Sequence, residues 1–78
     1  MRQKKPTLVI TFATTTQAMA MEKFCHAQGL PGRLIPVPRE ITAGCGLSWK
    51  ALPEDRQRLI TALEEAGMKW AACHILEV

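Results

Sequence analysis

The chain has 78 residues, the length of one small domain, and folding at this size hides only about 60–65% of the surface that the unfolded chain exposes. Hydrophobic residues make up 47% of the sequence and charged residues 22%, a balance that excludes a disordered or collagen-like chain. The net charge of +3 owes much to Arg2, Lys4 and Lys5. The remainder is close to neutral, which argues against nucleic-acid binding, because phosphate contacts need cations gathered on one face.

The first six residues are predicted to form a basic, flexible tail, followed by a single domain at residues 7–78. The opening imitates a secretory signal, with a small-x-small site at residues 18–20. Its apolar run is short, however, and cleavage after Ala20 would remove an entire strand from a minimal domain. We therefore expect no signal peptide. No apolar stretch is long enough to span a bilayer, so no membrane partner is predicted.

The first half of the domain predicts a strand and a helix. Residues 7–13, TLVITFA, are apolar and β-branched, as is typical of a buried strand. The threonines at 14–16 offer hydroxyls that cap a helix, and Gly29 with Pro31 ends that helix. Its inner stripe is predicted from apolar residues at helical spacing, namely Ala18, Met21, Phe24 and Cys25.

The second half predicts two strands, a helix and a last strand. Residues 33–38, RLIPVP, carry two prolines that cannot donate ladder hydrogen bonds, which predicts an edge strand. A glycine-rich loop follows, and residues 47–52 alternate as a third strand. Pro53 with two acidic residues opens a helix that Gly67 ends, and residues 70–78 form the final strand. The inner stripe of this second helix is predicted to be Leu59, Ile60, Leu63 and Ala66.

This βαββαβ order predicts an α+β fold, the ferredoxin-like sandwich with two helices on one face of a four-stranded antiparallel sheet. Right-handed crossovers make strands one and two parallel, with strand three between them. Three connections should then lie at one end of the sheet. They are the loop that holds Cys45, the turn at residues 14–16 and the turn at residues 67–69.

Cys45 stands between Gly44 and Gly46, a setting that a packing cysteine does not need. Glycines adopt positive φ readily, which allows consecutive amides to turn toward the sulfur, and Arg39 and Lys50 flank the loop in sequence. Each feature favours the thiolate, the form of cysteine that is nucleophilic. The alternative is a hairpin turn in which cysteine is only a small filler, because glycine clusters mark turns.

The run LIPVPREITAGCGLSW, together with LVITF near the start and LPED before the second helix, resembles the putative selenium/sulfur carrier protein-like family of small bacterial proteins. The resemblance extends from Thr7 to Ile75. It implies that Cys45 carries sulfur or selenium as a persulfide or selenopersulfide and passes it from donor to acceptor proteins. In this reading Arg39 and the amides of Gly46 and Leu47 stabilise the anion. Thr14, where typical members often have a nearby histidine, is a further supporting residue.

The other cysteines and the histidines are assigned to structure. Cys25 and Cys73 are predicted core residues, and the absence of CxxC or CxxH spacing argues against zinc or disulfides and favours the cytoplasm. His26 is expected on the outer face of the first helix, and His74 on the opposite sheet face from Cys73. We predict no metal, no cofactor and no conventional enzyme, since no hydrolytic triad is identifiable.

The two tryptophans, Trp49 and Trp70, are expected on the sheet face that the helices leave open. RNA-recognition modules stack bases on such a face with paired aromatics, which this chain lacks. A second copy, giving a homodimer, or a partner protein is the expected occupant. The alternative function is a non-catalytic interaction or regulatory module that uses residues 36–47 as its recognition surface.

Overall fold

The computed structural model describes residues 5–38, 41 and 46–77. Strand β1 (Pro6–Thr11) leads into helix α1 (Thr15–Gln28) and then strand β2 (Arg33–Pro36). Strand β3 (Leu47–Ala51) is followed by a 3-10 turn, η1 (Pro53–Asp55), helix α2 (Arg56–Glu65) and strand β4 (Ala72–Glu77).

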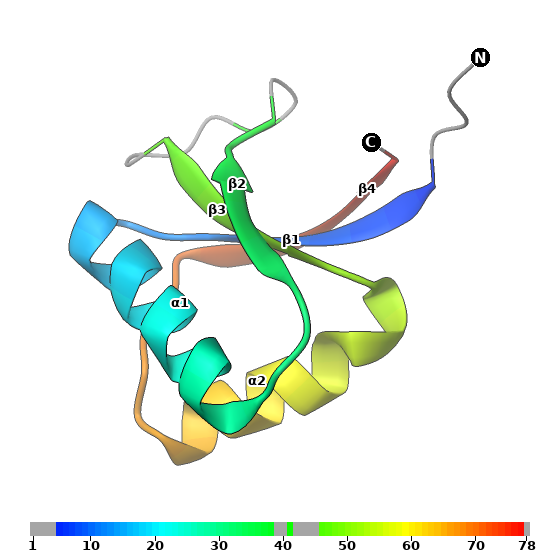
Figure 1. Cartoon of the computed structure of the whole chain (residues 1–78). Coiled ribbons are helices and arrows are strands. Elements are labelled where there is room, and N and C mark those ends of the chain that lie inside the picture. The colour runs from blue at the N-terminus through cyan, green and yellow to red at the C-terminus, as the bar shows by residue number, and fades with distance from the viewer. Residues whose placement is uncertain (1–4, 39–40, 42–45, 78) are drawn as a thin grey trace.

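The four strands form one antiparallel sheet in the order β2-β3-β1-β4, and both helices lie on the same side of it (Figure 1). Because β1 and β2 are each antiparallel to β3, they run parallel to one another with β3 between them. The α+β, ferredoxin-like prediction is confirmed, and so is the edge position of the proline-bearing strand β2. The predicted strands were one or two residues too long at several ends, and β1 begins one residue earlier than predicted.

Helix α1 has the caps that its sequence predicts. Thr14 has extended backbone angles, and its Oγ1 accepts a hydrogen bond of 3.1 Å from the Gln17 amide. The Gln17 side chain makes a second hydrogen bond at this end of the helix, since its Oε1 accepts from the Ala13 amide at 3.0 Å. At the other end Gly29 adopts a φ of 66°, and the Leu30 amide donates to the Cys25 carbonyl at 2.9 Å. Reciprocal capping of this kind fixes where the helix begins.

The core lies between the helices and the inner side of the sheet. Leu8 and Ile10 of the central strand β1 contribute to it, and Trp49 is its largest fully buried side chain. Partly buried side chains surround this cluster, including Trp70 and Cys73. Within the described ranges, neither helix is long and apolar enough to cross a membrane. The fully or nearly buried members are Leu8, Ile10, Phe12, Ala18, Met21, Cys25, Trp49, Ala51, Leu59 and Leu63.

The prediction that Trp49 and Trp70 lie on the sheet face that the helices leave open is wrong, because Trp49 belongs to the core and Trp70 packs against it. Trp49 pairs in register with Ile10 and Leu34, which lie on the helix-covered side, and it is only 2% exposed. A thin core gains most from burying its largest side chain, provided that the indole N–H finds an acceptor. That acceptor is the Pro31 carbonyl at 3.1 Å.

Candidate functional site

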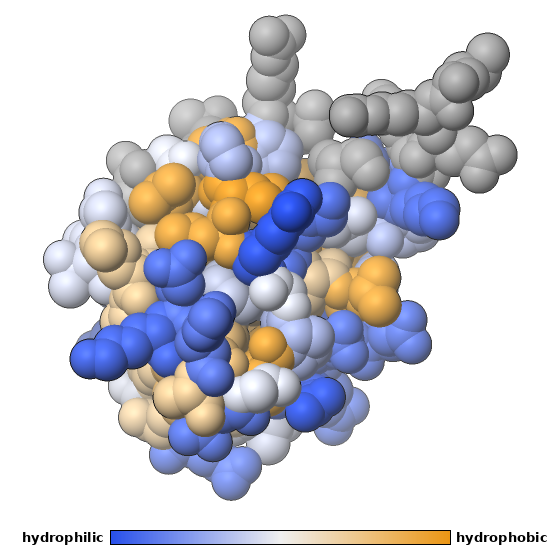
Figure 2. Space-filling model, viewed as in Figure 1, coloured by the Kyte–Doolittle hydropathy of each residue, from blue (hydrophilic) through white to orange (hydrophobic). Residues whose placement is uncertain are grey.

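The loop between β2 and β3 is held at its neck by the backbone. Pro36 and Leu47 are the last register pair of the two strands, and the Val37 amide then donates to the Gly46 carbonyl at 3.0 Å. The Ile41 amide also donates to the Pro38 carbonyl at 3.0 Å. The two ends of the loop therefore leave the sheet side by side. Figure 2 shows hydrophobic side chains gathered around this end of β2, next to strongly hydrophilic ones.

Three of the predicted site residues, Arg39, Gly44 and Cys45, lie outside the described residues. Gly46 is described and adopts a φ of 77°, while a Cβ built on it would meet nothing within 4 Å. The glycine is thus required by backbone conformation and not by lack of space. A left-handed residue costs about 1–2 kcal/mol when it carries a Cβ. Leu47, which follows it, is partly buried and packs against the core, so the strand is fixed from its first residue.

Several connections meet at the loop end of the sheet, as the topology predicts. Thr11, the last residue of β1, pairs with both Ser48 and Ala72, and its carbonyl accepts from the Ala71 amide at 2.8 Å. The capping residue Thr14 follows three residues later. Residues 67–69 line a shallow groove with Thr16, Gln17 and Ala20 of the first turns of α1. The described flanks of the loop therefore lie at the same end of the sheet as the start of α1.

Thr14 is exposed and its hydroxyl accepts the helix-capping hydrogen bond. The amino end of α1 carries no acidic residue in its first turn. A helix amino terminus bears partial positive charge, which favours anions nearby. Support of a thiolate by Thr14 stays a prediction, because Cys45 lies outside the described residues.

Ser48 is a residue that the sequence analysis missed. It is fully buried, and its hydroxyl has no hydrogen-bond partner in the described part of the chain. Its register partners are Thr11 and Ile35, so it lies on the sheet face away from the helices. A buried hydroxyl left without a partner costs about 1–3 kcal/mol. Nothing in the alternation of LSWKA signals this burial, since a serine between apolar residues reads as exposed.

The other thiols are held in the protonated form. Cys25 is 1% exposed, its thiol donates to the Met21 sulfur at 3.8 Å, and burial raises its pKa to about 11. Burial also raises the pKa of Cys73, although the charge of Arg56 and a hydrogen bond with Trp70 act in the opposite direction. The core assignment is confirmed for Cys25, and Cys73 packs half-buried against the core. Neither thiol is suited to nucleophilic chemistry near neutral pH.

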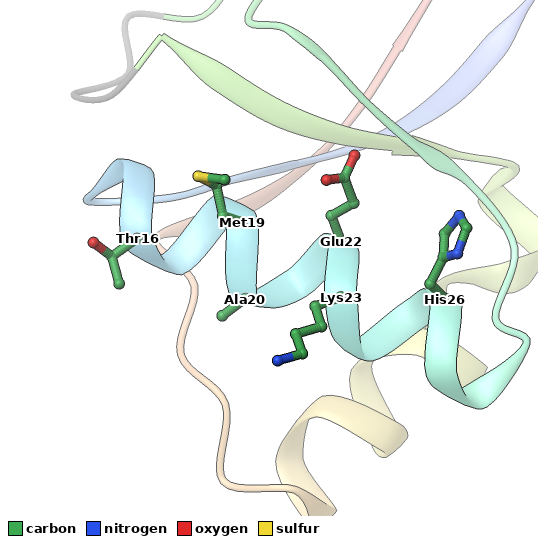
Figure 3. A pocket seen from close by; sticks show the side chains of 6 residues that line it. All are labelled: Thr16, Met19, Ala20, Glu22, Lys23 and His26. Atoms are coloured by element: carbon green, nitrogen blue, oxygen red, sulfur yellow. The ribbon is translucent and has the colours of Figure 1, made fainter.

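The outer surface of α1 carries a broad, shallow hollow (Figure 3). Met19, Glu22 and His26 project to one side of the helix, while Ala20 and Lys23 project to the other. His26 is exposed, as predicted. No group of three His, Cys, Asp or Glu side chains comes together as a metal-binding set in the part of the chain that the structure describes.

The fold and the loop define a class: a small ferredoxin-like domain with a hydrogen-bonded, cysteine-containing loop at one end of its sheet. The family model described as Putative Se/S carrier protein-like matches residues 7–75. The chain belongs to this family. Searches of curated proteins and of solved structures found no match.

Proposed function

We propose that the protein is a cytoplasmic carrier that holds sulfur or selenium on Cys45 and passes it to acceptor proteins. The observation that carries the proposal is the family match, which includes the whole β2–β3 loop. The raised pKa values of Cys25 and Cys73 add support, because they make these two thiols poor nucleophiles near neutral pH. Cytoplasmic thiols stay reduced, which the chemistry requires.

The transfer needs no cofactor and no net oxidation. The Cys45 thiolate attacks the outer sulfur of a persulfide on a donor protein, a new sulfur–sulfur bond forms, and the donor cysteine leaves as a thiolate. An acceptor thiolate then attacks the terminal sulfur, and Cys45 leaves as a thiolate in its turn. Selenium follows the same two displacements. The donor and acceptor proteins are the partners that this sequence of steps implies.

A carrier benefits from having a single reactive thiol, because a second one nearby would attack the persulfide and form a disulfide. Cys25 is a buried residue of α1 and Cys73 lies within β4, so both are part of the packed fold. Arg39 and the amides of Gly46 and Leu47 are proposed to stabilise the anionic sulfur. Thr14 is proposed to act indirectly, by fixing the start of α1 at the same end of the sheet.

Selective alkylation tests this proposal. At neutral pH, limited iodoacetamide should modify Cys45 much faster than Cys25 and Cys73, as measured by peptide mass spectrometry. Cys45→Ser should abolish the fast phase, while the matched variant Cys25→Ser should keep it. Equal modification of all three thiols, or of none, would remove the chemical basis of the carrier. If the protein is instead a regulatory module, Cys45→Ser should bind the partner as tightly as the wild type does, and Arg39→Ala should bind it more weakly.

A further inference from the structure

The two edges of the sheet differ in how they are protected. The strand order makes β2 and β4 the edge strands. An edge presents unpaired N–H and C=O groups to any other strand, and proline, lysine or short length is the usual protection. β2 has four residues and ends at Pro36, whereas β4 has six residues, ACHILE, with none of these protections. Among the described residues no strand pairs with the outer side of β4, so this edge can accept a further strand.

An exposed apolar side chain lies on the edge formed by β4. Ile75 pairs with the core residue Leu8 of β1, so it lies on the helix-covered side of the sheet. It is nevertheless 50% exposed, whereas Leu8 is 0% exposed. The helices therefore leave the outer margin of β4 uncovered. The large hydrophobic side chains that are exposed in the described ranges are Met19, Leu52 and Ile75, and of these Ile75 lies within a strand.

Opposite charges lie on this side of the sheet at the two ends of β4. Cys73, Ile75 and Glu77 share the helix-covered side, because side chains alternate along a strand. Glu77 is exposed at the end of β4. The exposed Arg56 of α2 lies near the start of β4, since its charge acts on the Cys73 thiol. Cys73 and Glu77 are about 13 Å apart along an extended strand. Within the described part of the chain, no ion pair joins Arg56 to Glu77.

We propose that β4 pairs antiparallel with β4 of a second copy of this chain, so that the two sheets become one continuous sheet. A two-fold axis perpendicular to the sheet passes through the Ile75 pair and keeps the helices of both copies on one side. Ile75 of each copy then packs against Ile75 of the other. Glu77 of each copy lies opposite Cys73 of the other, where it meets Arg56.

The neighbouring symmetric registers are less favourable. Pairing must keep side chains of one face together, so the axis passes through a residue and can only shift by whole residues. An axis at His74 would bring two histidines together and would place Glu77 beyond the start of the other β4. An axis at Leu76 would place the apolar Ile75 opposite Glu77. The register centred on Ile75 joins apolar to apolar and carboxylate to guanidinium.

Self-complementarity favours a second copy over another partner. The free backbone groups alone would accept any extended peptide, but the charges at the two ends of β4 match those of an antiparallel copy. The interface also lies at the edge opposite β2, three strand spacings or roughly 14 Å away. The dimer therefore goes beyond the proposed carrier function and does not depend on the chemistry of Cys45.

Sedimentation equilibrium of the full chain tests the dimer, in a reducing buffer that prevents disulfide-linked species. The wild type should show a monomer–dimer equilibrium. Ile75→Lys should abolish the dimer, because a charged side chain on an edge strand blocks edge-to-edge pairing. The matched control is Leu52→Lys, which changes a side chain of similar exposure (57%) outside β4 and should dimerise as the wild type does. A dispersed NMR spectrum of each variant verifies its fold.

Charge reversal tests the register. Glu77→Lys and Arg56→Glu should each weaken the dimer about tenfold, which corresponds to about 1.4 kcal/mol, because each change removes two symmetric ion pairs. The double variant that combines Arg56→Glu with Glu77→Lys should regain most of the lost affinity, since it restores opposite charges across the axis. High salt should weaken the wild-type dimer, because exposed charges are screened.

Amide hydrogen exchange locates the interface. Concentrated protein should protect alternate residues of β4 relative to dilute protein, because antiparallel pairing engages every second residue of an edge strand. Protection confined to other strands would contradict the proposal.

Other results would overturn the proposal as well. These are a chain that stays monomeric from micromolar to millimolar concentration, equal effects of Ile75→Lys and Leu52→Lys, or a double charge variant that associates no more tightly than the single ones. A monomer whose β4 binds an unrelated extended peptide would assign the edge to another occupant and would also overturn it. Cys45→Ser should dimerise as the wild type does. Failure of the dimer would therefore leave the carrier proposal standing, and loss of sulfur transfer alone would leave the dimer standing.

Discussion

Val37 donates its backbone N–H to the Gly46 carbonyl at 3.0 Å, one residue beyond the last register pair of β2 and β3. This hydrogen bond closes the neck of the loop that contains Cys45. It depends on the left-handed backbone of Gly46, whose φ is 77°. The conformation of one glycine is thus tied to the point at which the loop leaves the sheet.

Gly46→Ala should therefore lower the free energy of unfolding by about 1–2 kcal/mol, the cost of a left-handed alanine. No steric collision adds to this cost, because a Cβ at this position meets no atom within 4 Å. Gly46→Asn should lower the free energy of unfolding less, since asparagine adopts left-handed backbone angles more readily than alanine does. Urea denaturation measures both. An alanine variant as stable as the wild type would show that the neck does not require a left-handed residue.

Gly32→Ala should be more damaging than Gly46→Ala. Gly32 has a φ of 110°, and a Cβ there would collide with the indole of Trp49 and the Lys50 carbonyl. Strain and overpacking together predict a loss of about 2–4 kcal/mol and a shift in Trp49 fluorescence. Gly67→Ala is the matched control, because its φ of 70° is also positive but its surroundings are open. Equal losses for the two variants would contradict the close approach at Trp49.

Ser48→Ala should leave stability unchanged or raise it by about 1 kcal/mol, because it removes a buried hydroxyl that has no partner in the described chain. Thr11→Val tests a neighbour whose hydroxyl does have an acceptor, the Ala72 carbonyl at 3.4 Å, and it should be destabilising. Thermal denaturation of both variants makes the comparison. A large loss in Ser48→Ala would mean that this hydroxyl is hydrogen-bonded in solution.

Stability should also fall in alkaline solution because of Cys25. Burial raises the pKa of this thiol from 9.0 to about 11. Between these values the folded chain keeps a proton that the unfolded chain has lost, so the free energy of unfolding falls as pH rises. The contribution is fully present below pH 9 and declines by up to roughly 2–3 kcal/mol as pH reaches 11.

The comparison for this pH dependence is Cys25→Ala, followed by urea denaturation from pH 8 to 11. The variant is expected to start from lower stability, since it loses buried contacts, but to decline less steeply across the interval. Lysine titration affects both proteins alike. Parallel curves would show that Cys25 ionises as readily in the folded protein as in the unfolded chain.

The arrangement of the fold was predictable because local signals agreed with one another. Proline placed β2 at an edge, Thr14 and Gly29 marked the ends of α1, and the order of elements left one common right-handed topology. The position of Trp49 was not predicted correctly. Its face is set by pairing with Ile10 and by an acceptor at Pro31, which are contacts across the sheet and across the chain.

The candidate site was predictable only in part. The positive φ of Gly46 follows from its residue type, and the meeting of the loop flanks with the start of α1 follows from the topology. The buried hydroxyl of Ser48 and the hydrogen bond between Val37 and Gly46 depend on how neighbouring strands lie together. The pattern of residue types within one segment of the sequence carries no information on contacts between strands.

The most direct measurement is the intact mass of the protein after incubation with a sulfur or selenium donor, made on the wild type and on the three single cysteine-to-serine variants. If Cys45 carries the atom, the mass should rise by one sulfur or selenium atom in the wild type, in Cys25→Ser and in Cys73→Ser, and it should not rise in Cys45→Ser. A gain that persists in Cys45→Ser, or that is absent from the wild type, would contradict it.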